Sequence, residues 1–588
     1  MTSHFLPFLT WARHYNRANL TNDLIAAAVV TIMLVPQGMA YAMLAGLPPQ
    51  AGLYGAMLPL LIYAAFGTSR SLAVGPVAVV ALMTAAAAGT VAEIGAPGYH
   101  LAALWLALLS GAMLLLMGVF RMGFIASFLS HPVISGFITA AGILIAASQL
   151  RHLLGIETSG KTLPQVIPSI AANIGAVSLA TLALSASVLA FLIWSRAGLA
   201  ALLQRLGLSA PLAKLLGKTA LLLAVVVSTF ATWALGLDAM GVAILGDIPR
   251  GLPEFGLPAF DLTLIQLLAA PALMIAIVGY VESISIAQTL AAKKRQFVDA
   301  DKELVALGLA NLGAGASNAM PVTGGLSRSI VNHDAGAETP AAGAITAVMI
   351  ALAVLVLTPL MAYLPRATLA AIIIVAVLSL LDFRALPRTL AYSRADGAAM
   401  AATMAVTLLI GVEEGLLAGV GLSLVLYLYR TSRPHMAVVG QVAGTEHFRN
   451  VERHEVTQDP HVFSIRVDES LYFPNARALE DRIVQALADL PELRHVVLQA
   501  NAVNYIDASA LESLEAINDR LKAAEVQFHL SEVKGPVMDQ LKRSHFLDDL
   551  TGEVFLTQFD AMATLSPELT RACLQAERCE TLRPLPAQ

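Results

Sequence analysis

The chain has 588 residues, of which 57% are hydrophobic and only 13% are charged. Soluble domains carry about 25% charged residues, so this balance excludes an ordinary soluble protein and predicts a polytopic membrane protein. Residues 1–433 hold 22 basic against 17 acidic side chains and the remainder 14 against 24, a charge distribution that argues against nucleic acid as a partner.

The amino-terminal stretch MTSHFLPFLTWARHYNRANLTND is polar and amphipathic and lacks the pattern of a cleavable signal peptide. From Leu24 to Tyr429, short polar breaks then separate about fourteen apolar segments, some of them too short to cross a bilayer. If the amino terminus is cytoplasmic, nearly all basic residues fall on the cytoplasmic side. The four exceptions are Arg151, Lys161, Arg250 and Arg366. We therefore expect a multi-pass protein of the cell (inner) membrane with its amino terminus and its carboxy-terminal domain in the cytoplasm.

The first apolar segment, TIMLVPQGMAYAMLAGLPP, contains polar side chains that a lipid-facing helix does not need. Pro36 frees a backbone carbonyl, and Gln37 next to it carries both hydrogen-bond donors and an acceptor. Tyr41 follows four residues later on the same helical face. Taken singly, each of these residues is equally compatible with packing.

Two later segments have the pattern of interrupted helices. Gly75 and Pro76 precede a short apolar run in SLAVGPVAVVALM, and Gly324 and Gly325 do the same in PVTGGLSRSIVN. Matched Gly/Pro-interrupted segments in two halves of a chain are typical of an inverted-repeat transporter, whose binding site lies where they meet. The alternative for a single break is an ordinary helix kink.

Two such half-helices would meet with their amino-terminal ends facing each other. Each end presents unpaired N–H groups and about half a positive charge, so the pair favours an oxyanion. Ser327 adds a hydroxyl donor and Arg328 adds a full charge. We expect this polar stretch to form an anion site.

Glu282 lies in the middle of another apolar run, AIVGYVESISIAQTLAAKKRQ. A carboxylate within a membrane span is costly, so it indicates a functional or paired group. One interpretation is a static Glu282–Arg328 ion pair that joins two spans. The other is an ion-coupling site at which proton uptake accompanies binding of the anion.

From Pro434 the pattern changes to that of a soluble α/β domain. HVFSIRV, RHVVLQA and VQFHLSEV are predicted strands, and DASALESLEAINDRLKAAE and PVMDQLKRSHF are predicted helices. We expect domains at residues 1–433 and 434–565 and a tail at 566–588. The two cysteines, Cys573 and Cys579, match no zinc or redox spacing.

The stretch VPQGMAYAMLAGLPPQAGLYGAMLPLLIYAAFGTSRSLAVGPVAV resembles the opening signature of the SulP (sulfate permease, solute carrier 26) anion transporters. PVTGGLSRSIVN is similar to the motif of that family's tenth span, and the carboxy-terminal domain resembles its STAS domain. The resemblance implies about fourteen helical spans in a seven-plus-seven inverted repeat, with core and gate domains, a homodimer and a cytoplasmic α/β STAS domain. It places the anion site at Gln37, Tyr41, Pro76, Val77, Ala78, Ser327 and Arg328. The residue pattern adds Gly324 and Gly325, whose lack of a side chain would let an anion approach the backbone. Val77 departs from the aromatic residue that many members carry.

The loop VNYIDASALESL resembles the Asp-Ser-Ser-Gly loop of anti-sigma-factor antagonists. Ser509 matches the serine that is phosphorylated there, which makes it a candidate regulatory residue, but Ala508 and Ala510 replace its neighbours. The preferred interpretation is an ordinary helix start capped by Asp507.

These observations predict a secondary active transporter of sulfate or a similar small oxyanion, coupled to protons and working by alternating access among membrane lipids. Sodium-coupled bicarbonate transport, proton-coupled dicarboxylate transport and an anion channel on the same fold are the alternatives, as is a membrane sensor whose output is the STAS domain. Glu282 is more similar to the acid of proton-coupled sulfate members than to the aspartate of sodium–bicarbonate members. The sequence contains no recognisable metal cluster, cofactor motif or nucleophile–base pair, so we expect neither an enzyme nor a cofactor.

Overall fold

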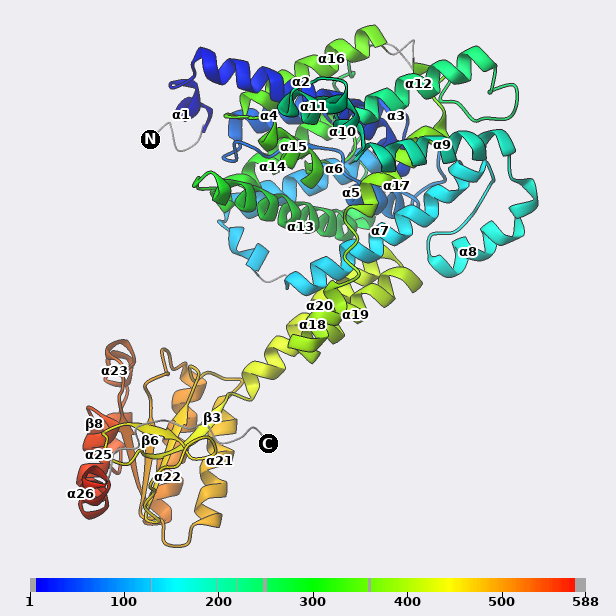
Figure 1. Cartoon of the computed structure of the whole chain (residues 1–588). Coiled ribbons are helices and arrows are strands. Elements are labelled where there is room, and N and C mark those ends of the chain that lie inside the picture. The colour runs from blue at the N-terminus through cyan, green and yellow to red at the C-terminus, as the bar shows by residue number, and fades with distance from the viewer. Residues whose placement is uncertain are drawn as a thin grey trace. The chain divides into compact units, whose positions relative to one another are not determined.

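The computed structural model describes residues 7–127, 130–196, 198–217, 219–246, 251–357 and 361–576. Contacts divide the chain into two units, Met1–Ser423 and Leu424–Gln588. Figure 1 shows that the first unit is built almost entirely from helices, and that the second combines a sheet with helices. The boundary expected at Arg433 comes directly after helix α20 (Val412–Ser432), which crosses from one unit into the other.

The first half of the helical unit is built from short and long helices and one two-residue strand. In chain order these are α1 (Phe8–Ala12), α2 (Arg17–Leu44), α3 (Pro49–Tyr54), α4 (Leu58–Phe66), β1 (Val74–Gly75), α5 (Ala78–Ala88), α6 (Pro97–Val119), η2 (Gly123–Ser127), α7 (His131–Leu154), α8 (Leu163–Ala172), η3 (Ile174–Ala176), α9 (Leu179–Ser195), α10 (Gly198–Arg205), α11 (Ala210–Gly217) and α12 (Ala220–Leu235).

The second half repeats the pattern of a two-residue strand followed by a short helix. Its elements are α13 (Leu262–Lys293), α14 (Ala300–Ala316), β2 (Thr323–Gly324), α15 (Leu326–Asp334), α16 (Ala341–Leu357), α17 (Arg366–Leu378), α18 (Ala385–Tyr392), α19 (Arg394–Leu409) and α20.

Five helices in the described part of the chain are long and apolar enough to cross a membrane, or six if the bent pair α9 and α10 is one span. The five are α2, α6, α7, α13 and α20. Other apolar helices, such as α5, α12 and α17, are shorter. The helical membrane architecture is as expected, whereas the number of about fourteen spans stays a prediction.

Small residues allow the helices of the two halves to pack closely. Where α6 crosses α14, a Cβ built on Gly111 would lie 2.8 Å from the carbonyl oxygen of Gly308, and one built on Gly308 would lie 2.9 Å from that of Gly111. Such contacts between backbones are typical of helix pairs in membranes, where van der Waals packing and not hydrophobic burial drives association. This crossing joins the two halves of the unit.

Helix α2 remains continuous through Pro36, which lies inside it. The side chain of Asn16 caps its amino terminus by accepting from the backbone N–H of Asn19. Gln37 and Tyr41 are both buried on this helix.

The second unit contains a six-stranded sheet in the order β4-β3-β5-β6-β7-β8. The strands are β3 (Met436–Gln441), β4 (Phe448–Asn450), β5 (Val462–Val467), β6 (His495–Gln499), β7 (Gln527–Ser531) and β8 (Val554–Phe555). β5 to β8 pair in parallel, and β3 pairs antiparallel with both β4 and β5. The three predicted strands correspond to β5, β6 and β7 and are confirmed.

Helices cover both faces of this sheet (Figure 1). Along β5 the side chains alternate, so that Phe463, Ile465 and Val467 pack into the core beneath α21 (Ala476–Asp489), α22 (Ala508–Ala523) and α23 (Gly535–Leu541). Val462 faces the other way, towards α25 (Gln558–Leu565). The remaining helices are α24 (Phe546–Asp549) and α26 (Pro567–Gln575).

The first part of the predicted tail, residues 566–588, is folded. Helix α26 begins at Pro567, one residue after the predicted start of the tail, and packs on α25. Cys573 on α26 is buried, and its carbonyl accepts from the N–H of Gly444 at 2.8 Å. Cys579, like Arg250, lies outside the described residues.

Candidate functional site

The two interrupted segments lie side by side in the structure. β1 and β2 form a two-stranded antiparallel ladder in which Val74 faces Gly324 and Gly75 faces Thr323. Helix α5 begins three residues after Gly75, and α15 begins two residues after Gly324. No side chain caps the amino terminus of either helix. The ladder therefore brings together two helix ends whose first N–H groups have no capping side chain, as the inverted-repeat pattern predicts.

Contacts within the second half hold this ladder in place. The hydroxyls of Ser283 and Thr323 share a hydrogen bond of 2.6 Å, and Thr323 also donates to the carbonyl of Gly279 on α13. The side chain of Asn311 bonds both the N–H and the carbonyl of Val322. Sequence reasoning did not select these residues, although Ser283 and Asn311 are polar residues within apolar helices and could have been found on that ground.

Most of the predicted site residues surround one small cavity of about 40 Å³. One buried water needs about 10–15 Å³ by this measure, so the space corresponds to about three waters. The cavity lies between α2, α5, α13, α15 and the end of α17. Its lining consists of Gln37, Tyr41, Val77, Ala78, Val79, Glu282, Gly325, Leu326, Ser327, Arg328, Ala376, Ser379 and Leu380.

Arg328 is the principal charge at this cavity and is only 2% exposed. Its Nη1 donates to the carbonyl oxygen of Pro76 at 2.6 Å. Its Nε and Nη2 are buried, and no group in the described part of the chain accepts a hydrogen bond from them. A buried cationic donor without a partner is costly, so this arrangement favours a bound anion.

Gly325 lies in direct contact with this guanidinium group. A Cβ built on Gly325 would lie 2.8 Å from Nη2 of Arg328. Gly75 has a φ of +155° and a hypothetical Cβ 3.3 Å from the same nitrogen. A side chain at position 325 would therefore push against the guanidinium group and force it to shift.

Glu282 lines the same cavity, from α13. Within the described residues it forms no ion pair, and in particular none with Arg328. The static Glu282–Arg328 pair is therefore absent, and the carboxylate and the guanidinium both remain available to a ligand.

Two larger cavities adjoin the small one. The first, of about 500 Å³, is lined by Gln37 and Ser327 and extends to Arg196 at the end of α9. The second, of about 330 Å³, extends from Glu282 along α13 past Ser285 and Thr289 to Lys293. Ser379 lines all three cavities and was missed in the sequence, where nothing distinguishes it from other helix-end serines.

Three predicted residues do not line the small cavity. Pro76 contributes only its carbonyl, to Arg328. Gly324 lies in the ladder, and its N–H donates to the hydroxyl of Ser283 at 2.8 Å and not to the cavity. Ser509 belongs to the second unit, where it is exposed on the first turn of α22. Asp507 caps that helix by accepting from the N–H of Ala510 at 2.8 Å, as expected.

Comparison with known proteins identifies the family. Residues 20–403 match the model of the sulfate permease family, and residues 453–561 match that of the STAS domain. The chain belongs to the sulfate permease family. Because this is a family of permeases, the chain is a multi-pass membrane transporter and not an enzyme.

Relatives align along nearly the whole chain. It is 34% identical over 567 residues to the chloroplastic sulfate transporter 4.1 of Arabidopsis thaliana, with 94% of this chain and 81% of the relative covered. It is 32% identical over 554 residues to a probable sulfate transporter of Mycobacterium tuberculosis, with 94% and 96% covered.

Solved structures show the same fold. Murine solute carrier 26 family member A9, an anion transporter solved in the inward-facing state, matches with a TM-score of 0.88 at 22% identity and covers 96% of this chain and 95% of that one. The transmembrane domain of the cyanobacterial bicarbonate transporter BicA matches with a TM-score of 0.59 at 22% identity, covering 69% and 99%. The family, the membrane fold and the STAS domain expected from the sequence are thus confirmed.

Proposed function

We propose that this permease carries sulfate, or a small oxyanion of similar charge, inward together with protons by alternating access. The observation that carries the proposal is the guanidinium group of Arg328, which is buried beside the ends of α5 and α15 with two donor nitrogens lacking a partner. A tetrahedral oxyanion would accept from these donors, from the Ser327 hydroxyl and from the Gln37 amide. The relatives named as sulfate transporters support sulfate as the substrate.

The size of the cavity supports a compact substrate. A space of about 40 Å³ beside Arg328 is of the size of a compact inorganic anion. The positive groups around it also favour a doubly charged anion over a singly charged one, because about one positive charge comes from the two helix ends and another from Arg328.

The location of Glu282 supports proton coupling. It lines both the anion cavity and the cavity that extends to Lys293, so a proton can reach it by a route that does not pass Arg196. An ionised Glu282 would oppose a doubly charged anion, and a protonated one would not. Binding of sulfate and binding of a proton then favour each other, as linkage requires.

We further propose that the protein is a homodimer in the inner membrane, with its amino terminus and its STAS domain in the cytoplasm. The positive-inside distribution places Arg196 and Lys293 on the cytoplasmic side. The two larger cavities extend to these residues, which supports an inward-facing state.

Uptake into proteoliposomes tests the function. Labelled sulfate, bicarbonate and succinate are compared under an imposed proton gradient or sodium gradient. We expect sulfate to accumulate above equilibrium only with the inward proton gradient. Sodium-driven uptake of bicarbonate would instead indicate a bicarbonate carrier, and uptake of succinate would indicate a dicarboxylate carrier. Equilibration of sulfate without accumulation would indicate a channel or a sensor.

A further inference from the structure

A second cavity with a basic lining lies apart from the anion cavity. It has a volume of about 410 Å³ and shares no lining residue with the small cavity around Arg328. Its walls include Trp11 from α1, Arg70 from the turn after α4, Arg295 and Phe297 from the segment between α13 and α14, Lys302 from the first turn of α14, and Pro340. Segments far apart in the sequence thus converge on one basic cavity.

A buried carboxylate holds two of these segments together. Glu303 on α14 is 0% exposed, and its Oε1 accepts from the N–H and hydroxyl of Thr68, both at 2.7 Å, and from the N–H of Ser69 at 3.1 Å. Its Oε2 accepts from the Tyr63 hydroxyl at 2.8 Å. The turn that carries Arg70 is therefore fixed to α14, which makes the wall preorganised.

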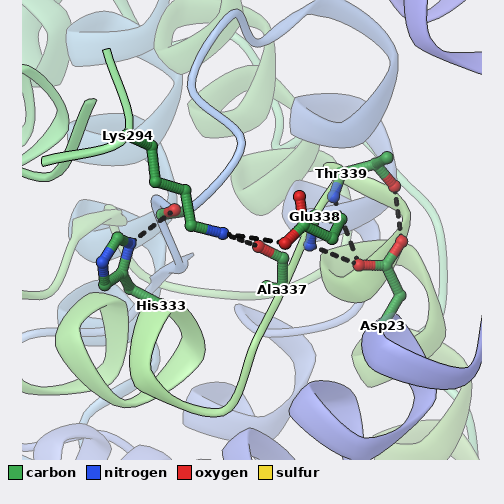
Figure 2. Close-up of polar contacts among 7 residues, drawn as sticks. Asp23, Lys294, His333, Ala337, Glu338 and Thr339 are labelled. Atoms are coloured by element: carbon green, nitrogen blue, oxygen red, sulfur yellow. Dashed lines mark hydrogen bonds and ion pairs between the residues drawn. The ribbon is translucent and has the colours of Figure 1, made fainter. Parts of the chain in front are cut away.

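The loop that leads to Pro340 is held by the contacts that Figure 2 shows. Asp23 accepts from the N–H of Glu338 at 2.8 Å and from the Thr339 hydroxyl at 2.6 Å, which anchors the loop before Pro340 to α2. Lys294 donates to the carbonyl of Ala337 at 2.9 Å and pairs with Glu338 at 3.2 Å. The ammonium group of Lys294 is thus engaged by groups of the protein itself, whereas the neighbouring Arg295 forms no such contact within the described residues.

The charges that remain in the cavity are positive and unpaired. Arg70 and Arg295 are exposed, and neither forms an ion pair or a side-chain hydrogen bond within the described residues. The single acid of the lining, Asp299, pairs with Lys302 at 3.4 Å. The indole nitrogen of Trp11 is buried without an acceptor in the described part of the chain. The cavity therefore offers more donors than the protein can satisfy, as expected for a phosphate site.

Two candidate membrane spans end or begin within a few residues of this cavity's lining. The candidate span Leu262–Lys293 ends two residues before Arg295, and the candidate span that begins at Arg17 starts six residues after Trp11. Phe297 is 85% exposed beside the basic residues. A large apolar side chain next to unpaired cations at the end of a span matches a lipid, which offers acyl chains and a phosphate together.

We propose that this cavity binds the headgroup of an anionic membrane phospholipid. Arg70 and Arg295 contact the phosphate, and Trp11 and Phe297 contact the glycerol and acyl region. A soluble phosphate compound would contact the same cations but has no acyl chain to pack against the exposed Phe297. The bound lipid would bridge the turn that leads into β1 and the segment that leads into α14. β1 pairs with β2, and Asn311 on α14 bonds Val322 next to β2, so both elements contact the ladder beside the anion site.

Native mass spectrometry of the full-length protein tests the proposal, with phosphatidylglycerol and phosphatidylcholine as probes. The wild type should retain phosphatidylglycerol over phosphatidylcholine. The double variant Arg70→Gln/Arg295→Gln should bind phosphatidylglycerol about thirtyfold more weakly, because each basic residue near an anionic surface contributes a factor of about five to binding. Arg205→Gln is the matched control, since Arg205 is also exposed and basic but lies outside this cavity, and it should bind as the wild type does.

A second variant and a soluble probe separate the two sources of phosphate. Phe297→Ser changes an exposed side chain and should leave folding intact while it weakens retention of phosphatidylglycerol several-fold. Millimolar glycerol 3-phosphate should not displace the lipid. Unchanged retention of phosphatidylglycerol in both the double arginine variant and Phe297→Ser would overturn the proposal. Displacement of the lipid by glycerol 3-phosphate, together with unchanged lipid binding in Phe297→Ser, would also overturn it.

Discussion

Nη1 of Arg328 donates to the carbonyl oxygen of Pro76 at 2.6 Å, across 252 positions of the sequence. This bond joins Pro76, two residues before α5, to the first turn of α15 and fixes the direction in which the guanidinium group points. Because one nitrogen is engaged by the protein, the fork cannot rotate freely, and Nε and Nη2 remain for a ligand. The anion site is thus preorganised by a single contact between the two halves of the repeat.

Arg328→Lys should bind sulfate more weakly than the wild type, by about tenfold or more, and Arg328→Ala more weakly still. Lysine keeps the charge but loses the fork that contacts Pro76 and the anion at once, and alanine removes both. Isothermal titration calorimetry on the purified variants measures this. Equal affinities of the lysine variant and the wild type would show that the two unpartnered nitrogens do not hold the anion.

Ser327→Ala and Gln37→Ala should each weaken sulfate binding by about two- to tenfold, because each removes one donor worth about 0.5–1.5 kcal/mol. Ser110→Ala is the matched control. Ser110 is buried and donates to the carbonyl of Ala107 within α6, away from the cavity. If the control weakens binding as much as Ser327→Ala does, the effect belongs to general destabilisation and not to the site.

Glu282→Gln should abolish sulfate accumulation driven by an inward proton gradient while leaving binding largely intact. Glutamine imitates the protonated side chain permanently, so sulfate binding should also lose its dependence on acid pH. Proteoliposome uptake and equilibrium binding between about pH 5 and 8 provide the two measurements.

Glu93→Gln serves as the control for this experiment, since Glu93 is exposed and lies outside the cavities around Arg328. It should transport as the wild type does. A Glu282→Gln protein that still concentrates sulfate in response to the proton gradient would remove Glu282 from the coupling mechanism.

Truncation after Arg433 should leave sulfate binding unchanged. Every residue of the small cavity, from Gln37 to Leu380, belongs to the first unit, and α20 ends at Ser432. Binding to the purified, monodisperse truncation, compared with the full chain, provides the measurement. Loss of binding in a truncation that keeps its melting temperature would show that the STAS domain takes part in the site directly.

The STAS domain should lose stability as the pH falls from about 6.5 to 4. Burial, and secondarily the neighbouring His495, lowers the pKa of His529 from 6.5 to about 4. The unfolded state therefore binds more protons across this window, and the loss reaches about 3 kcal/mol when the pH has fallen to the native pKa of about 4. His529 is only 2% exposed, and its Nδ1 accepts from the N–H of Glu553 at 2.9 Å, a bond that a protonated ring cannot keep.

Chemical denaturation of the fragment 434–576 at several pH values tests this. His529→Asn keeps an acceptor near Glu553 but cannot titrate, so its stability should vary less between pH 6.5 and 4. His545→Asn is the control, because the His545 side chain is 93% exposed and should not contribute. An unaltered pH profile in His529→Asn would contradict the assignment.

The sequence by itself determined the membrane class, the interrupted helices, the family and the strands β5 to β7. These features follow from local physics, since apolar runs, Gly/Pro breaks and period-two alternation act over a few neighbouring residues. Gln37, Glu282, Ser327 and Arg328 could be selected for the same reason, as polar groups in apolar segments carry their cost wherever they pack.

Only the tertiary structure decided which of these groups are paired. It engages Gly324 with Ser283, gives Arg328 one partner and leaves two of its nitrogens free, and keeps Glu282 out of an ion pair. It also adds Ser379 to the cavity and fixes the basic cavity through Glu303. Each of these contacts joins residues that the chain separates widely or that local pattern does not distinguish, so they depend on how whole helices pack and not on the composition of any one segment.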